Sequence, residues 1–103
     1  MFYTMEEVKA ANKAMGRYWF SPGAMRFFQS RAGSELYGGK YFVSSERKPR
    51  TGFHDRYPRR YTIREAHLDG KITTVGEFQQ YSTRNAAISG IKRILKESND
   101  EQK

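Results

Sequence analysis

The sequence predicts an α+β domain in which a three-stranded antiparallel β-meander packs against a C-terminal helix and two N-terminal helices (α-α-β-β-β-α). Apolar residues in the N-terminal third recur at helical spacing. After Gly38 and Gly39 the pattern changes to the alternation of strands, and it returns to helical spacing near the C-terminus. We expect all three helices to cover one face of the sheet. The other face is then open to solvent and carries positive charge.

The first element is a helix over residues 4–15. Thr4 and Glu7 form a capping-box pair, in which each side chain accepts one of the free amide N–H groups. Gly16 is well placed to end the helix. Its apolar stripe consists of Met5, Val8, Ala11 and Met15.

A second helix follows a short aromatic run. Ser21 and Pro22 are the residue types of an N-cap and a first helical position, so we expect a helix over residues 24–31 that ends at Gly33. Its inward positions are Ala24, Met25, Phe27 and Phe28. Aromatic residues between two amphipathic helices are typical of a core, so Trp19 and Phe20 are expected inside, with an exposed partner anchor as the alternative.

Three strands come next, over residues 40–44, 60–66 and 71–78. In the second strand, Tyr61 and Ile63 point to one face. The polar alternate positions, which we expect on the solvent face, are Arg60, Thr62 and Arg64.

The turn between the second and third strands is expected at Asp69 and Gly70, a strong hairpin signal. A two-residue loop places Ile63 opposite Gly76, whereas a longer loop would shift this register. The last helix starts at Ser82 and ends near Glu97. Its core-facing stripe consists of Ala87, Ile88, Ile91, Ile94 and Leu95.

A chain of 103 residues has room for one domain with one core. We expect that domain over residues 1–97 and a polar tail over residues 98–103. The absence of cysteine excludes disulfides, thiolate metal ligands and a cysteine nucleophile. No apolar run reaches the roughly 18 residues of a membrane span, and the start lacks a signal-peptide pattern. The sequence thus favours a cytoplasmic protein with no membrane partner.

The strongest functional signal is the connection between the first two strands, residues 47–59. It is long for a hairpin and rich in Lys and Arg, with Asp55 as its one acid. Basic groups with interleaved aromatic residues suit a phosphate backbone and stackable bases. The candidate binding residues here and on the second strand are Arg47, Lys48, Arg50, Phe53, Arg56, Tyr57, Arg59, Arg60 and Arg64.

The net charge of +8 leaves three interpretations of this segment open. The first is a DNA- or RNA-binding surface that contacts the backbone without sequence preference. The second is docking to the acidic surface of a host protein. The third is a solvated basic surface that only keeps the protein soluble.

The sequence predicts no catalytic site, metal site or cofactor. His54 lies beside Asp55, but adjacent residues rarely direct their side chains at each other, and no nucleophile motif accompanies them. With His67 as the only other histidine, a zinc site would need carboxylates from elsewhere. Glu46 and Lys48 have the E-x-K spacing of magnesium-dependent nucleases, yet no preceding strand supplies an Asp.

One set of residues in the C-terminal third follows a known signature. It consists of Asp69-Gly70-Lys71-Ile72, Phe78, Tyr81-Ser82-Thr83-Arg84-Asn85-Ala86-Ala87 and Gly90-Ile91. This stretch resembles the YegP-like domain, which has a β-β-β-α unit. The same layout is similar to the arm-type DNA-binding domain of phage integrases, in which a three-stranded sheet reads DNA. Neither resemblance implies a catalytic residue.

Further patterns extend over most of the chain. They are Trp19-Phe20-Ser21, Met25-Arg26-Phe27-Phe28, residues 37–46 and Gly76-Glu77-Phe78-Gln79. The chain resembles small uncharacterised proteins of phages and other mobile elements. The resulting hypothesis is a small basic, non-enzymatic nucleic-acid-binding protein of this type. The alternative is a phage-encoded inhibitor of a host defence protein.

Overall fold

The computed structural model describes residues 1–47 and 58–101. The described elements are α1 (Met5–Ala14), α2 (Pro22–Arg26), β1 (Arg31–Ala32), β2 (Tyr41–Glu46), β3 (Arg60–Ala66), β4 (Ile72–Val75) and α3 (Arg84–Glu101). The strands form one antiparallel sheet in the order β1-β2-β3-β4. The predicted α+β class is confirmed. The sheet has a fourth strand because β1 adds to the edge of β2.

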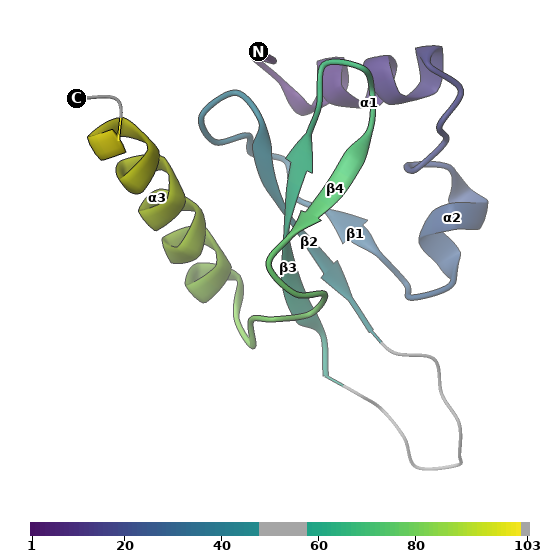
Figure 1. Ribbon diagram of the computed structural model, residues 1–103. Coiled ribbons are helices and arrows are strands. Elements are labelled where there is room, and N and C mark those ends of the chain that lie inside the picture. Colours follow the sequence, from purple (N-terminus) through teal and green to yellow (C-terminus); the bar gives the residue numbers. More distant parts are fainter. Residues whose placement is uncertain (48–57, 102–103) are drawn as a thin grey trace.

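The helices cover both faces of the sheet, with α3 on one side and α1 and α2 on the other (Figure 1). The α3 side of the core contains Tyr41, Val43, Ile63, Ala87 and Ile91. The α1 side contains Met5, Val8, Phe42 and Ala66. The expectation that the three helices share one face is therefore wrong. The polar side of β3, which was expected to face solvent, lies on the α1 side.

The first helix and the aromatic run after it follow their predictions. The Thr4 hydroxyl accepts the Glu7 N–H at 3.2 Å, and α1 ends within a residue of its expected end. Trp19 and Phe20 pack on the buried ring of Phe42, at centroid distances of 5.9 and 6.0 Å. These two aromatic residues thus complete the α1 side of the core.

The second helix is shorter than predicted. The Ser21 hydroxyl accepts the Ala24 N–H at 3.2 Å, as expected of an N-cap, but α2 ends at Arg26. Gln29 has a left-handed backbone (φ 48°), and the strand that follows pairs with β2. Sheet pairing therefore overrides the local helical preference. As a result Phe27, which was expected inside, is 67% exposed.

The β3–β4 hairpin differs from its prediction by one residue in register. The loop has three residues and is closed by the His67 N–H, which donates to the Lys71 carbonyl at 2.9 Å. Gly70, the last loop residue, has the left-handed conformation (φ 88°) typical of such loops. Ile63 therefore lies opposite Val75, and each side chain of β4 points to the face opposite to the predicted one.

The C-terminal helix buries the apolar face that the sequence predicts and is longer than predicted. Ala87 and Ile91 are fully buried against the sheet, as the apolar stripe predicts. The Thr83 hydroxyl accepts the Ala86 N–H at 3.1 Å, so Thr83 takes the capping role expected of Ser82. α3 continues to Glu101, beyond its expected end.

Gly70 lets the hairpin tip approach α1. A Cβ atom there would lie 2.6 Å from the Ala11 carbonyl oxygen, and φ is +88°. Gly16 has a similar φ of +72° with open space around it. We expect Gly70→Ala to lower the free energy of unfolding in urea by more than Gly16→Ala, for which the left-handed backbone alone costs about 1–2 kcal/mol.

Gly23 is the control for this comparison. It lies in α2 with open space around it, and its φ is outside the left-handed range. Gly23→Ala should leave stability unchanged or raise it by up to about 1 kcal/mol. Equal losses for Gly70→Ala and Gly16→Ala would show that the contact with Ala11 carries no cost.

Candidate functional site

The structure describes four of the nine predicted binding residues: Arg47, Arg59, Arg60 and Arg64. The other five, together with His54 and Asp55, lie outside the described residues; the five are Lys48, Arg50, Phe53, Arg56 and Tyr57.

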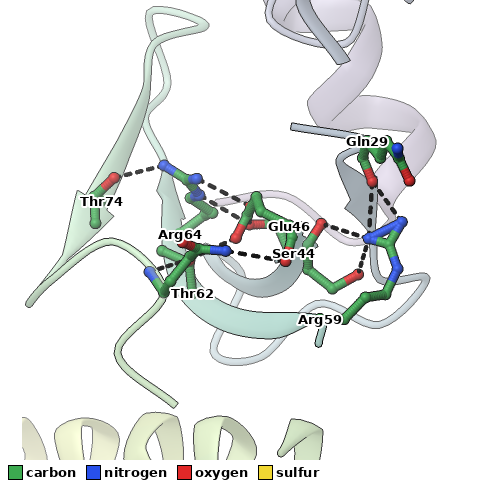
Figure 2. A network of polar contacts seen from close by, with 9 residues as sticks. Gln29, Ser44, Glu46, Arg59, Thr62, Arg64 and Thr74 are labelled. Atoms are coloured by element: carbon green, nitrogen blue, oxygen red, sulfur yellow. Dashed lines mark hydrogen bonds and ion pairs between the residues drawn. The ribbon is translucent and has the colours of Figure 1, made fainter. Parts of the chain in front are cut away.

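Arg64 is buried rather than exposed, with a relative accessibility of 8%. Its guanidinium forms an ion pair with Glu46 at 3.1 Å and donates to the Ser44 hydroxyl at 2.9 Å (Figure 2). The guanidinium carbon also lies 5.3 and 5.5 Å from the ring centroids of Trp19 and Phe78. The expectation of a solvent-facing Arg64 is wrong because aromatic residues on the α1 side cover this face.

Glu46 is enclosed by the same network, with an exposed fraction of 0%. The Thr62 hydroxyl donates to its carboxylate at 2.7 Å, and the Ser44 hydroxyl donates to its other oxygen (Figure 2). Thr62, which was expected on the solvent face, is fully buried as well. Among residues 1–47 and 58–101, no group of three or more His, Cys, Asp or Glu gathers as a metal site.

Arg60 holds the loop that follows β4. Its Nε donates to the Gln79 carbonyl at 2.8 Å, and its Nη2 donates to the Gln80 carbonyl at 3.1 Å. The Gln79 N–H in turn donates to the Thr62 hydroxyl at 2.8 Å. Arg60 is thus a positioning residue in the structure, although carbonyl partners leave its positive charge unneutralised.

Arg59 connects the turn before β1 to the end of β2. Its Nη1 donates to the Gln29 carbonyl at 2.8 Å and to the Ser45 hydroxyl at 3.3 Å (Figure 2). Burial lowers the pKa of the Arg59 guanidinium, and the positive charges of Arg31 and Arg47 lower that pKa further. Three arginine side chains therefore lie near one another at this end of the sheet.

These arginines share the α3 face of the sheet. Arg31 pairs with Ser45, and Ser45 pairs with Tyr61, so these three side chains point to the same side. The Arg59 guanidinium donates to the Ser45 hydroxyl, and Arg47 follows Ser45 by two residues, just after the end of β2. The sequence could not indicate Arg31, because only the pairing of β1 with β2 brings it here.

A fourth arginine comes from the start of α3. Arg84 and Arg31 line one pocket of about 90 Å³, together with Ser45 and Tyr61. We name Arg31, Arg47, Arg59 and Arg84 the arginine cluster. Arg84 was also missed by the sequence analysis, since it lies far along the chain from the basic segment.

Two carboxylates lie near the arginine cluster, those of Glu35 and Glu46, but each has another partner. None of the four ion pairs formed within the described part of the chain includes any of its members. Glu46 is paired with Arg64, and Glu35 accepts a hydrogen bond from the Tyr37 hydroxyl at 2.9 Å. Burial and Glu35 raise the pKa of Tyr37 while Arg84 lowers it, which places Arg84 within reach of this pair. The arrangement suits an anion with several oxygens.

The buried ion pair predicts a large stability effect. Arg64→Met would leave the Glu46 carboxylate buried without its cation, so the free energy of unfolding in urea should fall by about 3–5 kcal/mol. Arg93→Met, at an exposed position of α3, removes the same charge and should change stability by no more than about 0.5 kcal/mol. A loss below about 1 kcal/mol for Arg64→Met would contradict the buried pair.

Among the described residues, no helix combines the length and apolar character needed to cross a membrane. Comparison with curated proteins and with solved structures finds no match. The model of one protein family, DUF7447, a family of unknown function, matches residues 4–92. Because this match spans most of the chain, the protein belongs to the DUF7447 family.

Proposed function

We propose that the protein binds nucleic acid through the arginine cluster and catalyses no reaction on it. The observation that supports this proposal is the convergence of four arginines at one end of the α3 face, without an ion-pair partner among the described residues. Guanidinium groups bind phosphate oxygens in a bidentate geometry. Like charges held this close repel one another, and a bound phosphate relieves that repulsion.

The sequence extends this positive charge. The chain between Arg47 and Arg59 adds Lys48, Arg50 and Arg56, and the net charge is +8. Contacts to phosphates supply affinity without reading base identity. We therefore propose binding that is largely independent of sequence, in a protein of phage or mobile-element type.

A second candidate is an acidic protein surface, as for a phage-encoded inhibitor of a host defence protein. The exposed aromatic side chains favour it, since Phe27 and Tyr18 are 67% and 58% exposed. Aromatic and arginine residues dominate protein interfaces energetically. The two candidates differ in their dependence on salt, because phosphate contacts release counterions from the nucleic acid.

The salt dependence of binding tests the first candidate. We expect Arg31→Ala and Arg84→Ala each to weaken the binding of labelled DNA or RNA about five- to tenfold at 100 mM salt. Each should also reduce the log–log slope against salt by about 0.9 on duplex DNA, as one phosphate contact is lost. Fluorescence anisotropy from about 50 to 300 mM salt measures both quantities.

Arg93→Ala is the charge-matched control. It removes one charge from α3 at a point about 13 Å along the helix from Arg84. Binding to nucleic acid should change less than twofold. If Arg93→Ala weakens binding as much as Arg84→Ala, the interaction follows net charge and the arginine cluster is no specific site. Absence of binding at about 150 mM salt would reject nucleic acid and favour the acidic protein partner.

A further inference from the structure

Three phenylalanine rings form an exposed ledge on the α1 side of the sheet, at the end where the arginine cluster lies on the α3 side. The rings of Phe27 and Phe28 meet edge to face at a centroid distance of 4.6 Å, and Phe28 lies 5.0 Å from Phe78. Phe27 is 67% exposed and Phe78 is 41% exposed, whereas Phe28 is half-buried between them. We name these three residues the aromatic ledge. Neighbouring exposed rings of this kind mark binding surfaces more often than isolated ones.

The backbone has an unusual conformation at the residues that follow Phe28 and Phe78. Gln29 directly follows Phe28, and Gln79 directly follows Phe78; both have left-handed φ angles, of 48° and 58°. Such angles cost about 1–2 kcal/mol at a residue other than glycine. Strain of this kind persists where surrounding contacts enforce it, and it gathers at functional sites.

The contacts that enforce these two turns come from arginines. The Gln29 carbonyl accepts from the Arg59 guanidinium, and the Gln79 carbonyl accepts from Arg60 Nε at 2.8 Å. The Phe28 carbonyl accepts the Arg47 N–H at 2.7 Å. Arg47, Arg59 and Arg60 thus hold the backbone next to the aromatic ledge, and two of them, Arg47 and Arg59, belong to the arginine cluster.

Phe78 has a further support on its inner side. The buried Arg64 guanidinium carbon lies 5.5 Å from the centroid of the Phe78 ring and also contacts the ring of Trp19. Arg64 is itself fixed by its ion pair with Glu46. Phe78 is therefore a preorganised ring with an exposed surface, which limits the ordering cost of binding a planar group.

We propose that Phe27 and Phe78 are stacking platforms for unpaired bases, so that the substrate of the arginine cluster is single-stranded nucleic acid. This inference rests on the proposed function and narrows its substrate class. Aromatic side chains stack on exposed bases, and the bases inside a duplex are not exposed. Every base has a face that can stack, so stacking does not depend on sequence. A single strand presents both phosphates and bases, and one that passes around this end of the sheet would reach the arginine cluster on one face and the aromatic ledge on the other.

The positive charge around the aromatic ledge favours a nucleic acid over a protein as its binding partner. The Arg47 N–H contacts the Phe28 carbonyl, and the Arg59 and Arg60 guanidinium groups contact Gln29 and Gln79, the residues after Phe28 and Phe78. The Arg59 and Arg60 guanidinium groups donate to neutral carbonyl and hydroxyl groups, so their positive charges remain available to an anion. A polyanion with stackable rings matches both properties at once, and single-stranded nucleic acid is such a molecule.

The test compares three labelled probes of equal length, about 20 nucleotides. They are oligothymidylate, an abasic deoxyribose-phosphate strand and a DNA duplex. In the chain of 103 residues, Phe27→Ala and Phe78→Leu should each weaken oligothymidylate binding about fivefold to 100-fold. Leucine at position 78 keeps apolar bulk over Phe28 and Arg64. Binding to the abasic strand and to the duplex, and the dependence on salt, should remain those of the wild type.

Tyr3→Ala is the matched control, since Tyr3 is an aromatic residue that is 83% exposed and lies outside the aromatic ledge. It should leave all three affinities unchanged, and urea unfolding confirms that each variant is folded. If Phe27→Ala and Phe78→Leu weaken the binding of the abasic strand as much as that of oligothymidylate, the rings do not stack on bases and the proposal is overturned. Wild-type binding to the duplex as tight as to oligothymidylate would overturn the single-strand preference and leave the proposed function standing. Failure to bind any probe would overturn both.

Discussion

The buried ion pair between Arg64 and Glu46 organises the polar interior of the sheet and withdraws Arg64 from the cations at the surface. Both charges lie between the sheet and the aromatic residues of the α1 side. Removing two charges from water costs several kcal/mol per ion. The attraction between the charges offsets this cost only if the geometry is good and the remaining donors and acceptors are satisfied. Hydroxyl groups satisfy them here, on Ser44, Thr62 and Thr74. This requirement explains why neighbouring inward positions of β2, β3 and β4 are polar.

The same network shapes the surface above it. The Thr62 hydroxyl, which donates to Glu46, accepts the Gln79 N–H, and the Gln79 side-chain amide donates to the Glu46 carbonyl at 3.0 Å. The loop after β4 is thereby tied to the sheet interior, and Phe78 is displayed next to Arg64. The polar interior and the surface shape are coupled here, because Thr62 binds both Glu46 and the loop that carries this ring.

Local signals in the sequence predict the parts of the fold that local physics determines. The bounds of β3, the cap of α1 at Thr4 and the buried stripe of α3 depend on residues a few positions apart. Other features depend on distant residues. The alternation of Arg, Thr and Arg in β3 is compatible with a face exposed to solvent and also with a buried face whose polar groups are paired. Glu46 and Trp19, which come from other parts of the chain, pair with and cover Arg64 and so make this face a buried one. Likewise, Arg31 and Arg84 join the site only through strand pairing and helix docking, which no local pattern encodes.

The arginines predicted to bind a partner therefore divide by role, although the sequence presents them as one patch. Arg64 is neutralised inside the fold, Arg60 holds a turn by carbonyl contacts, and Arg59 combines such contacts with a place in the arginine cluster. The lowered pKa of Arg59 means that folding places its charge in a less favourable environment, through burial and through Arg31 and Arg47. An anion bound at the cluster would offset this penalty in the folded state alone. A partner of this kind would thus stabilise the fold as it binds.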